Sequence, residues 1–193
     1  MNHSPYPVVP DACVIYPNML RDLLMEPGKA GLYQPKWTAT IHDEWQRNLV
    51  ENVPALTREK LKRVRVEELM NKALPDALVT GFENLVEGLL LPDPDDRHVV
   101  AAAIRSNSEM IVTFNLKDFP GERLAEFDIE AIHPDEFIAD LLDLNQALVL
   151  QAVQRQRSRP RNPPKSVDEY SDTLLKLGLP MTVRALAAYK LMI

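Results

Sequence analysis

Four acidic residues stand where carboxylates can act together on a substrate. Asp11 and Asp118 each follow a short apolar run of the kind that forms buried strands. Asp96 begins an alanine-rich stretch after a proline turn, and Glu44 lies on a stretch with helical periodicity. In an open α/β sheet, ligand sites gather at the carboxyl ends of the strands. We therefore expect Asp11 and Asp118 to lie at one edge of a sheet, with Asp96 close to them.

Carboxylates held together at such an edge repel one another unless a proton or a cation lies between them. An oxygen-only ligand set without a cysteine partner suits a hard cation, so the expected cofactor is Mg²⁺ or Mn²⁺. Each acid also has an ordinary structural role open to it, because Asp11 or Asp96 can cap a helix and Asp118 can close a turn. The order and contexts of the four acids together favour the metal site.

The elements that must position these acids alternate between strands and helices. The expected strands cover residues 6–10, 110–113 and 129–132, and the expected helices cover residues 12–25, 38–52, 57–73 and 99–104. Pro27 and Gly28 are expected to end the first helix, and Thr38 or Thr40 to cap the second. This alternation predicts a parallel sheet covered by helices on both faces. From Pro134 onward the pattern is helical only.

Length and composition indicate an ordinary globular protein. The chain has 193 residues, of which 46% are hydrophobic and 26% charged. We expect no secretory signal, since no basic region followed by an apolar stretch stands at the N-terminus, and no run approaches the ~18 apolar residues of a membrane span. A single cysteine, Cys13, excludes an internal disulfide and favours a reducing, cytoplasmic setting.

Charge is unevenly distributed along the chain. The formal net charge is −6, but residues 1–150 carry −11 and residues 151–193 carry +5. A polyanionic substrate therefore needs local basic patches or bound cations. Two basic stretches could provide them, although each could equally be a solvated face or a linker. Their members are Arg58, Lys60, Lys62, Arg63 and Arg65 in the first, and Arg155, Arg157, Arg159, Arg161 and Lys165 in the second.

The acidic positions lie within four segments that together resemble the motifs of PIN-domain nucleases. Val8–Val14 resembles the first motif, and Ile41–Glu44 resembles the helix that carries the second acid. Asp93–Ala103 is similar to the third motif, and Ile111–Phe119 is similar to the fourth. The resemblance covers roughly residues 6–140 and is closest to VapC-like toxins of bacterial type II toxin–antitoxin modules, in the branch with a helical C-terminal extension.

The resemblance implies a PIN-like three-layer α/β/α fold, with a nuclease domain at residues 1–140, a helical extension at 141–193, and a Pro/Arg-rich linker near 155–166. It implies a hydrolase that cleaves RNA with Mg²⁺ or Mn²⁺ and leaves a 5′-phosphate and a 3′-hydroxyl. It also implies a cognate antitoxin and a homodimer as assemblies. The residues carried over as metal ligands and catalytic acids are Asp11, Glu44, Asp96 and Asp118, with Thr113 and Asn115 as polar supports. Arg155, Arg157, Arg159 and Arg161 are the candidates for RNA phosphate contacts.

Two other functions stay open, and one of them rests on a departure from the family pattern. The family often has Asn, Ser or Thr two residues after the first Asp, where this chain has Cys13. A thiol is a weak hydrogen-bond donor, so a non-catalytic PIN fold that binds RNA or docks an antitoxin is one alternative. An aspartate-dependent phosphohydrolase or phospho-receiver is the other, because it also needs an acid after the first strand. His42 and His98 flank acids without a required role, and Trp37 and Trp45 are expected in the core.

Overall fold

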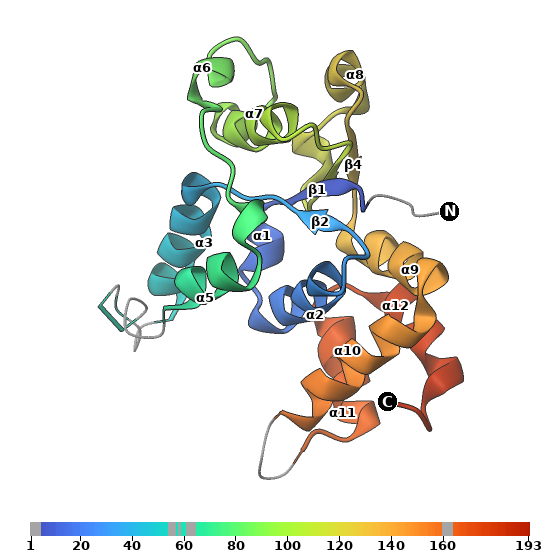
Figure 1. The fold of residues 1–193 in the computed structure, drawn as a ribbon. Coiled ribbons are helices and arrows are strands. Elements are labelled where there is room, and N and C mark those ends of the chain that lie inside the picture. The colour runs from blue at the N-terminus through green and yellow to red at the C-terminus, as the bar shows by residue number, and fades with distance from the viewer. Residues whose placement is uncertain (1–4, 54–56, 58, 61–64, 160–163) are drawn as a thin grey trace.

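A four-stranded parallel sheet forms the centre of the molecule. The computed structural model describes residues 5–53, 57, 59–60, 65–159 and 164–193. Its strands are β1 (Pro7–Pro10), β2 (Gln34–Pro35), β3 (Met110–Val112) and β4 (Glu130–Ile132), in the spatial order β2-β1-β3-β4. β1 pairs in parallel with β3, and β3 pairs in parallel with β4. The carboxyl ends of these three strands therefore share one edge of the sheet (Figure 1).

Helices follow each strand, as the alternation in the sequence predicts. Those of the first 144 residues are α1 (Ala12–Ile15), α2 (Asn18–Lys29), α3 (Ala39–Asn52), α5 (Val66–Ala73), α6 (Glu83–Val86), α7 (Arg97–Arg105), α8 (Gly121–Leu124) and α9 (Pro134–Leu144). The C-terminal segment adds α10 (Gln146–Ser158), α11 (Val167–Lys176) and α12 (Pro180–Leu186). Short 3-10 turns are η1 (Pro75–Ala77), η2 (Pro94–Asp96), η3 (Leu116–Asp118), η4 (Ala125–Phe127) and η5 (Ala187–Tyr189).

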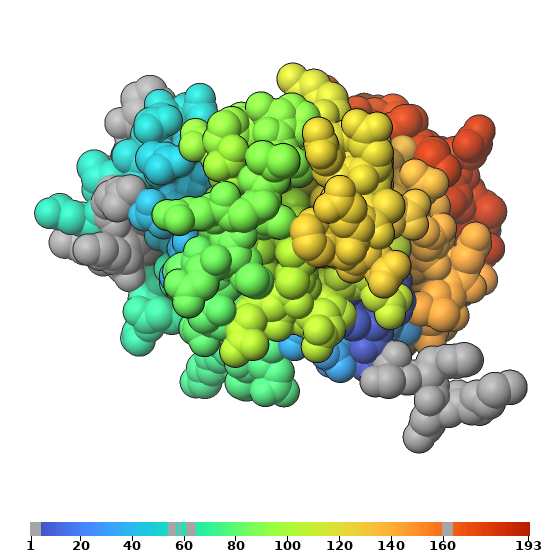
Figure 2. All heavy atoms as spheres, turned by 90° about the horizontal axis from the view of Figure 1, so that it is seen from above, coloured from blue at the N-terminus to red at the C-terminus, as the bar shows by residue number. Residues whose placement is uncertain are grey.

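The two faces of the sheet carry separate hydrophobic cores. Successive residues of a strand point to opposite faces, so Val8 and Val112 pack into one core while Val9 and Ile111 pack into the other. The first core joins α2 and α9 to the C-terminal helices, and the second joins α3, α5, α7 and α8. Figure 2 shows the face on which α6 and α7 (green) and α8 (yellow) lie, with the C-terminal segment in orange and red along one side.

This arrangement is the predicted PIN-like three-layer α/β/α class with a helical C-terminal extension. The domain boundary at residue 140 stays a prediction. The helix expected over residues 12–25 was wrong in two ways. The chain breaks at Pro17 into α1 and α2, and α2 continues through Pro27 to Lys29. Pro27 has no N–H to donate to the carbonyl of Leu23, so α2 continues through this position with one helical hydrogen bond missing.

Two expectations are limited by the described residues. Thr38 caps α3 as predicted, because its side chain accepts a hydrogen bond from the backbone N–H of Ile41. Of the helix expected over residues 57–73, the structure describes α5, and Arg58, Lys62 and Arg63 of the first basic stretch lie outside the described residues. Among the described helices, none combines the length and apolar character needed to cross a membrane.

Candidate acidic active site

Asp11 is the most rigidly held of the four predicted acids. It follows β1 and caps α1, with Oδ1 accepting a hydrogen bond from the backbone N–H of Ala12 at 2.6 Å. Its other oxygen, Oδ2, accepts from the hydroxyl of Thr113 at 2.7 Å and from the thiol of Cys13 at 3.0 Å. The Asp11 side chain is therefore buried, with only 2% exposed, and its orientation is fixed from two neighbouring strands.

Thr113 belongs to a short turn that carries Asp118 away from β3. The backbone N–H of Asn115 donates to the Thr113 hydroxyl at 3.0 Å, and the backbone N–H of Asp118 donates to the Asn115 carbonyl at 2.9 Å. Asn115 thus supports Thr113 through its main chain, while its side chain is exposed. This turn places Asp118 in η3 on the same edge of the sheet as Asp11.

Asp96 is free of the capping role that the sequence left open for it. Asp93 caps the preceding turn η2 by accepting from the backbone N–H of Asp95 at 2.9 Å. Asp96 precedes α7 but makes no side-chain capping hydrogen bond. Its carboxylate is consequently available to the site rather than committed to the helix end.

The electrostatics bring the four acids together. Burial, followed by the charges of Asp11, Asp93, Asp118 and Glu44, raises the pKa of Asp96 to about 7. Burial and the charge of Glu44 also raise the pKa of Asp11, against the opposing hydrogen bonds of its donors. Because charge interactions weaken with distance, this mutual influence is consistent with carboxylates at the end of β1, on α3, in η2 and in η3 lying in one region.

Glu44 has a partner that the sequence interpretation set aside. His98 Nε2 lies 3.2 Å from Glu44 Oε2, with both side chains mostly buried. His98 Nδ1 is also buried and has no hydrogen-bond partner among the described residues. His98 lies in the first turn of α7, and this position was the available signal for its contact with Glu44. Asp96 lies outside that helix, so the two-residue spacing from Asp96 to His98 says little about where the His98 side chain points.

The helix that carries Glu44 is anchored in the core by aromatic side chains. Trp37 and Trp45 are each 1% exposed, as expected for core residues. The Nε1–H of Trp45 donates to His42 Nδ1 at 2.9 Å, and that of Trp37 donates to Asn71 Oδ1 at 2.7 Å. Burial lowers the pKa of His42 to about 4, which keeps this acceptor neutral at pH 7. His42 therefore braces α3 rather than exchanging protons with a substrate.

The predicted phosphate-binding arginines lie on a different part of the molecule, where acidic side chains of α2 face them. Arg155 Nη1 is 3.3 Å from Glu26 Oε2, and Arg159 pairs with both Asp22 and Glu26 at 3.0 Å. Arg157 donates to a backbone carbonyl, that of Lys165, at 2.7 Å. Arg161 lies outside the described residues. Arg155 and Arg159 thus help to hold α10 against α2, and the partners of Arg155, Arg157 and Arg159 named here all lie away from the acidic site.

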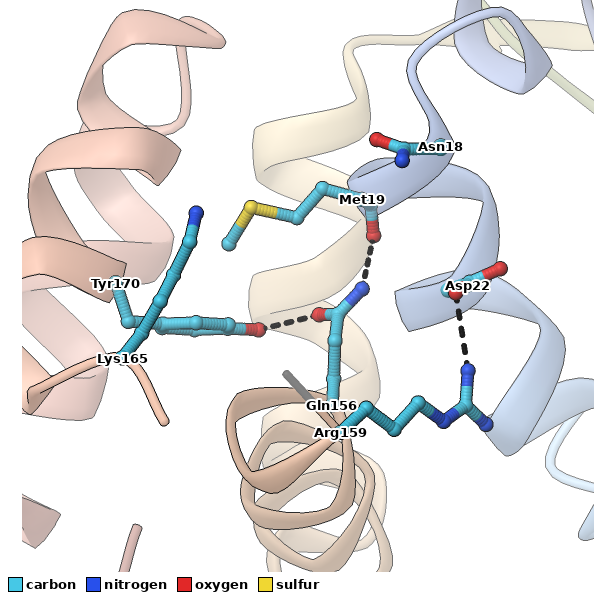
Figure 3. Close-up of a pocket in the computed structure, with 7 residues that line it drawn as sticks. All are labelled: Asn18, Met19, Asp22, Gln156, Arg159, Lys165 and Tyr170. Atoms are coloured by element: carbon cyan, nitrogen blue, oxygen red, sulfur yellow. Dashed lines mark hydrogen bonds and ion pairs between the residues drawn. The ribbon is translucent and has the colours of Figure 1, made fainter. Parts of the chain in front are cut away.

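A cavity of about 310 Å³ lies beside this seam (Figure 3). Gln156 crosses it, donating to the carbonyl of Met19 and accepting from the hydroxyl of Tyr170, each at 2.6 Å. Arg159 and Asp22 face each other at its rim. The hydrogen bonds of Gln156 and the ion pair of Arg159 with Asp22 therefore connect α2, α10 and α11 around the cavity.

The acidic site suits a hard divalent cation in charge and in donor chemistry. Its acids offer only oxygen ligands, and burial together with neighbouring carboxylates raises the pKa values of Asp11 and Asp96. Within residues 5–53, 65–159 and 164–193, however, no three His, Cys, Asp or Glu side chains are already grouped so that they could hold a metal ion. The carboxylates would therefore have to draw closer together around a cation.

Two comparisons with known proteins point in one direction. Residues 134–188 match the family model described as VapC50 C-terminal domain. The chain is also 44% identical over 99 residues to a protein of Mycobacterium tuberculosis (strain ATCC 25618 / H37Rv) named "Putative ribonuclease VapC50". That match covers 49% of this chain and 58% of the relative, so the chain spans little more than half the length of the protein it matches. No solved structure gives a significant match.

Proposed function

We propose that this chain, whose resemblance to VapC-like toxins both comparisons support, is a metal-dependent endoribonuclease acting as the toxin of a toxin–antitoxin pair. The observation that carries the proposal is the convergence of Asp11, Glu44, Asp96 and Asp118 from four separate elements. Crowded carboxylates oppose folding in the absence of a cation, so their presence calls for a functional reason. A metal site that cleaves phosphodiesters needs such a cluster.

In this proposal the four acids bind the metal ion, and neighbouring side chains hold two of these acids in place. Asp11, Glu44, Asp96 and Asp118 would hold Mg²⁺ or Mn²⁺, which supplies an activated water and neutralises charge on the scissile phosphate. Thr113 and Cys13 hold the Asp11 carboxylate in one orientation through their hydrogen bonds to Oδ2. His98 holds Glu44 toward the same region. The side chains of Asp11 and Glu44 are therefore oriented before RNA arrives, which lowers the entropy lost on reaction.

The location and partners follow from this activity. An RNA-cleaving toxin works where RNA is available, which is the cytoplasm, and a cognate antitoxin and a homodimer are part of the proposal. An in-line hydrolysis at this site would leave a 5′-phosphate and a 3′-hydroxyl. The arginines of α10 would contact RNA phosphates only after giving up their acidic partners on α2.

Purified full-length protein incubated with tRNA, rRNA and mRNA provides the test. We expect cleavage with Mg²⁺ or Mn²⁺, none with EDTA, and products that carry a 5′-phosphate. The Asp118→Asn variant, purified in the same way, controls for contaminating nucleases. RNA binding without cleavage under any of these conditions would instead support a non-catalytic RNA-binding module. Phosphate release from a small phosphoester without RNA cleavage would support a phosphohydrolase.

A further inference from the structure

The turn between α11 and α12 lies against the loop that carries Thr113. Gly178 occupies this turn with a φ of +80°, and a Cβ at this position would be 3.9 Å from Phe114 Cε1. Phe114 directly follows Thr113 in the sequence, and its backbone N–H donates to Cys13 Sγ at 3.5 Å. Phe114 thus touches the C-terminal extension with its ring and the acidic site with its main chain.

The Phe114 ring also meets the junction of β4 and α9. The rings of Phe114 and His133 pack edge to face, with centroids 5.1 Å apart and planes at 80°. His133 Nδ1 accepts a hydrogen bond from the backbone N–H of Asp135 at 3.2 Å, which fixes the imidazole at the start of α9. The Phe114 ring is therefore held between the extension and the end of β4.

A buried carboxylate fastens the extension at this place. Asp135 is 3% exposed, and its two oxygens accept the backbone N–H groups of Met181 and Thr182, each at 2.7 Å. Hydrogen bonds to an ionised acceptor are stronger than neutral ones, and Thr182 is itself fully buried. The first turn of α12, and with it the adjacent turn at Gly178, is consequently tied to α9 close to Phe114.

We infer that the C-terminal extension positions the acidic site, with Phe114 as the positioning residue that connects the α11–α12 turn to Thr113 and through it to Asp11. Docking of α12 on Asp135 holds the Phe114 ring, and the ring holds the main chain from which the Thr113 hydroxyl reaches Asp11. Its catalytic consequence rests on the proposed ribonuclease function. The coupling between the extension and the Thr113 loop does not depend on that function.

The test compares Asp135→Asn and Phe114→Ala with matched controls in the full-length protein. Asp168→Asn controls for loss of a charge in the extension, because Asp168 makes an exposed ion pair with Lys190. Phe127→Ala controls for loss of an aromatic ring at a half-exposed position. Phe114→Leu keeps apolar bulk and should therefore retain most of the wild-type behaviour that Phe114→Ala loses. The readouts are amide hydrogen exchange, Mn²⁺ affinity, and kcat and KM for RNA cleavage.

We expect Asp135→Asn and Phe114→Ala to speed exchange of the Asn115 amide, which is bonded to the Thr113 hydroxyl, by about tenfold. Mn²⁺ affinity and kcat should each fall by about tenfold with KM within about twofold, while both controls stay at wild-type values. If the Met181 and Thr182 amides exchange rapidly in Asp135→Asn but exchange of the Asn115 amide and Mn²⁺ affinity do not change, the inference is wrong.

Should Asp135→Asn not fold, the comparison of Phe114→Ala with Phe114→Leu alone decides the inference. A wild-type protein that neither binds Mn²⁺ nor cleaves RNA would overturn the proposed function, and the exchange data would still decide the coupling.

Discussion

Two charged regions of the molecule differ in the signs of the charges that they bring together. At the carboxyl edge of the sheet, four acids crowd together, and the pKa of Asp96 is raised to about 7. In the seam between α2 and α10, Glu26 is surrounded by Lys29, Arg155 and Arg159. Burial alone would raise the pKa of Glu26, but these cations outweigh it and lower that pKa.

The difference separates charge placed for chemistry from charge placed for folding. Like charges at the edge oppose folding of the metal-free chain, and the proposed metal site accounts for their presence. Opposite charges in the seam support the docking of the extension and need no ligand. Variants of the two regions should therefore differ in the sign of their effects on stability.

The largest effect is expected on RNA cleavage at the acidic edge. Asp11→Asn keeps the size of the side chain but removes a metal-binding charge, so the cleavage rate should fall by about a thousandfold, or ~4 kcal/mol in activation free energy. Asp128→Asn is the matched control, because Asp128 is exposed and its left-handed backbone (φ 55°) accepts asparagine. Rates are measured on one labelled RNA in Mg²⁺. Full activity of Asp11→Asn would remove Asp11 from the site.

The next effect concerns stabilisation by a divalent cation. A cation that binds only the native state at a hundredfold excess over its Kd adds about 2.7 kcal/mol to the free energy of unfolding. For a chain of this length that corresponds to a rise in Tm of roughly 5–11 °C. Glu26→Gln, in the seam, should keep this rise, and Asp11→Asn should lose most of it. Equal melting temperatures in EDTA and in millimolar Mg²⁺ would contradict a metal site.

A smaller effect, of opposite sign in the two regions, is expected from pH. The folded-state pKa of Asp96 is raised from 3.8 to about 7, so the metal-free protein loses stability as pH rises across that window. Asp96→Asn should remove this loss and stabilise the metal-free protein above pH 7 by about 1 kcal/mol, after allowance for solvent screening of a half-buried group. The folded-state pKa of Glu26 is lowered from 4.5, so its contribution is present above that pH and is lost as pH falls below it. Urea titrations of Asp96→Asn and Glu26→Gln between pH 3 and 8 measure how the free energy of unfolding changes with pH in each region.

The smallest effect is expected from the arginines of the seam. Replacing Arg155 and Arg159 by Gln should cost about 0.2–1 kcal/mol per ion pair, and 0.5 M NaCl should reduce that cost, because both side chains are at least half exposed. RNA affinity measured as a function of salt tests the alternative role of these residues. If they bind RNA phosphates, the slope should flatten by about 0.7 for each phosphate that the variant no longer neutralises. An unchanged slope with lowered stability would assign them to folding alone.

Local signals in the sequence predicted β1, β3 and β4 of the described sheet and most of its helices, but not the short strand β2. Alternation of Val8 and Val9 between the two cores, and the cap at Thr38, follow from nearest-neighbour geometry and were readable without a structure. The break at Pro17 and the continuation of α2 through Pro27 were not, because tertiary packing decides whether a proline interrupts a helix or sits in its last turn.

The acids of the site were predictable as a group, since parallel strands end at a common edge. Their detailed partners were not. The contact of His98 with Glu44 and the seat of α12 on Asp135 join residues about fifty positions apart, and the ion pairs of Arg159 with α2 span more than a hundred. No periodicity marks such pairs, because they are selected by how helices pack and not by how each helix forms.

The hydrogen bond from Thr113 to Asp11 joins residues 102 positions apart. Besides β2, which is close to it in sequence, β1 pairs with β3, so more than half of the chain has to be synthesised before this second partner strand is available. Such non-local pairing slows folding and delays it during synthesis on the ribosome. A growing chain that has passed α7 but not β3 already contains three of the four acids, yet it lacks the strand that aligns them. Assembly of the four acids at one edge of the sheet therefore has to follow the synthesis of β3 and η3.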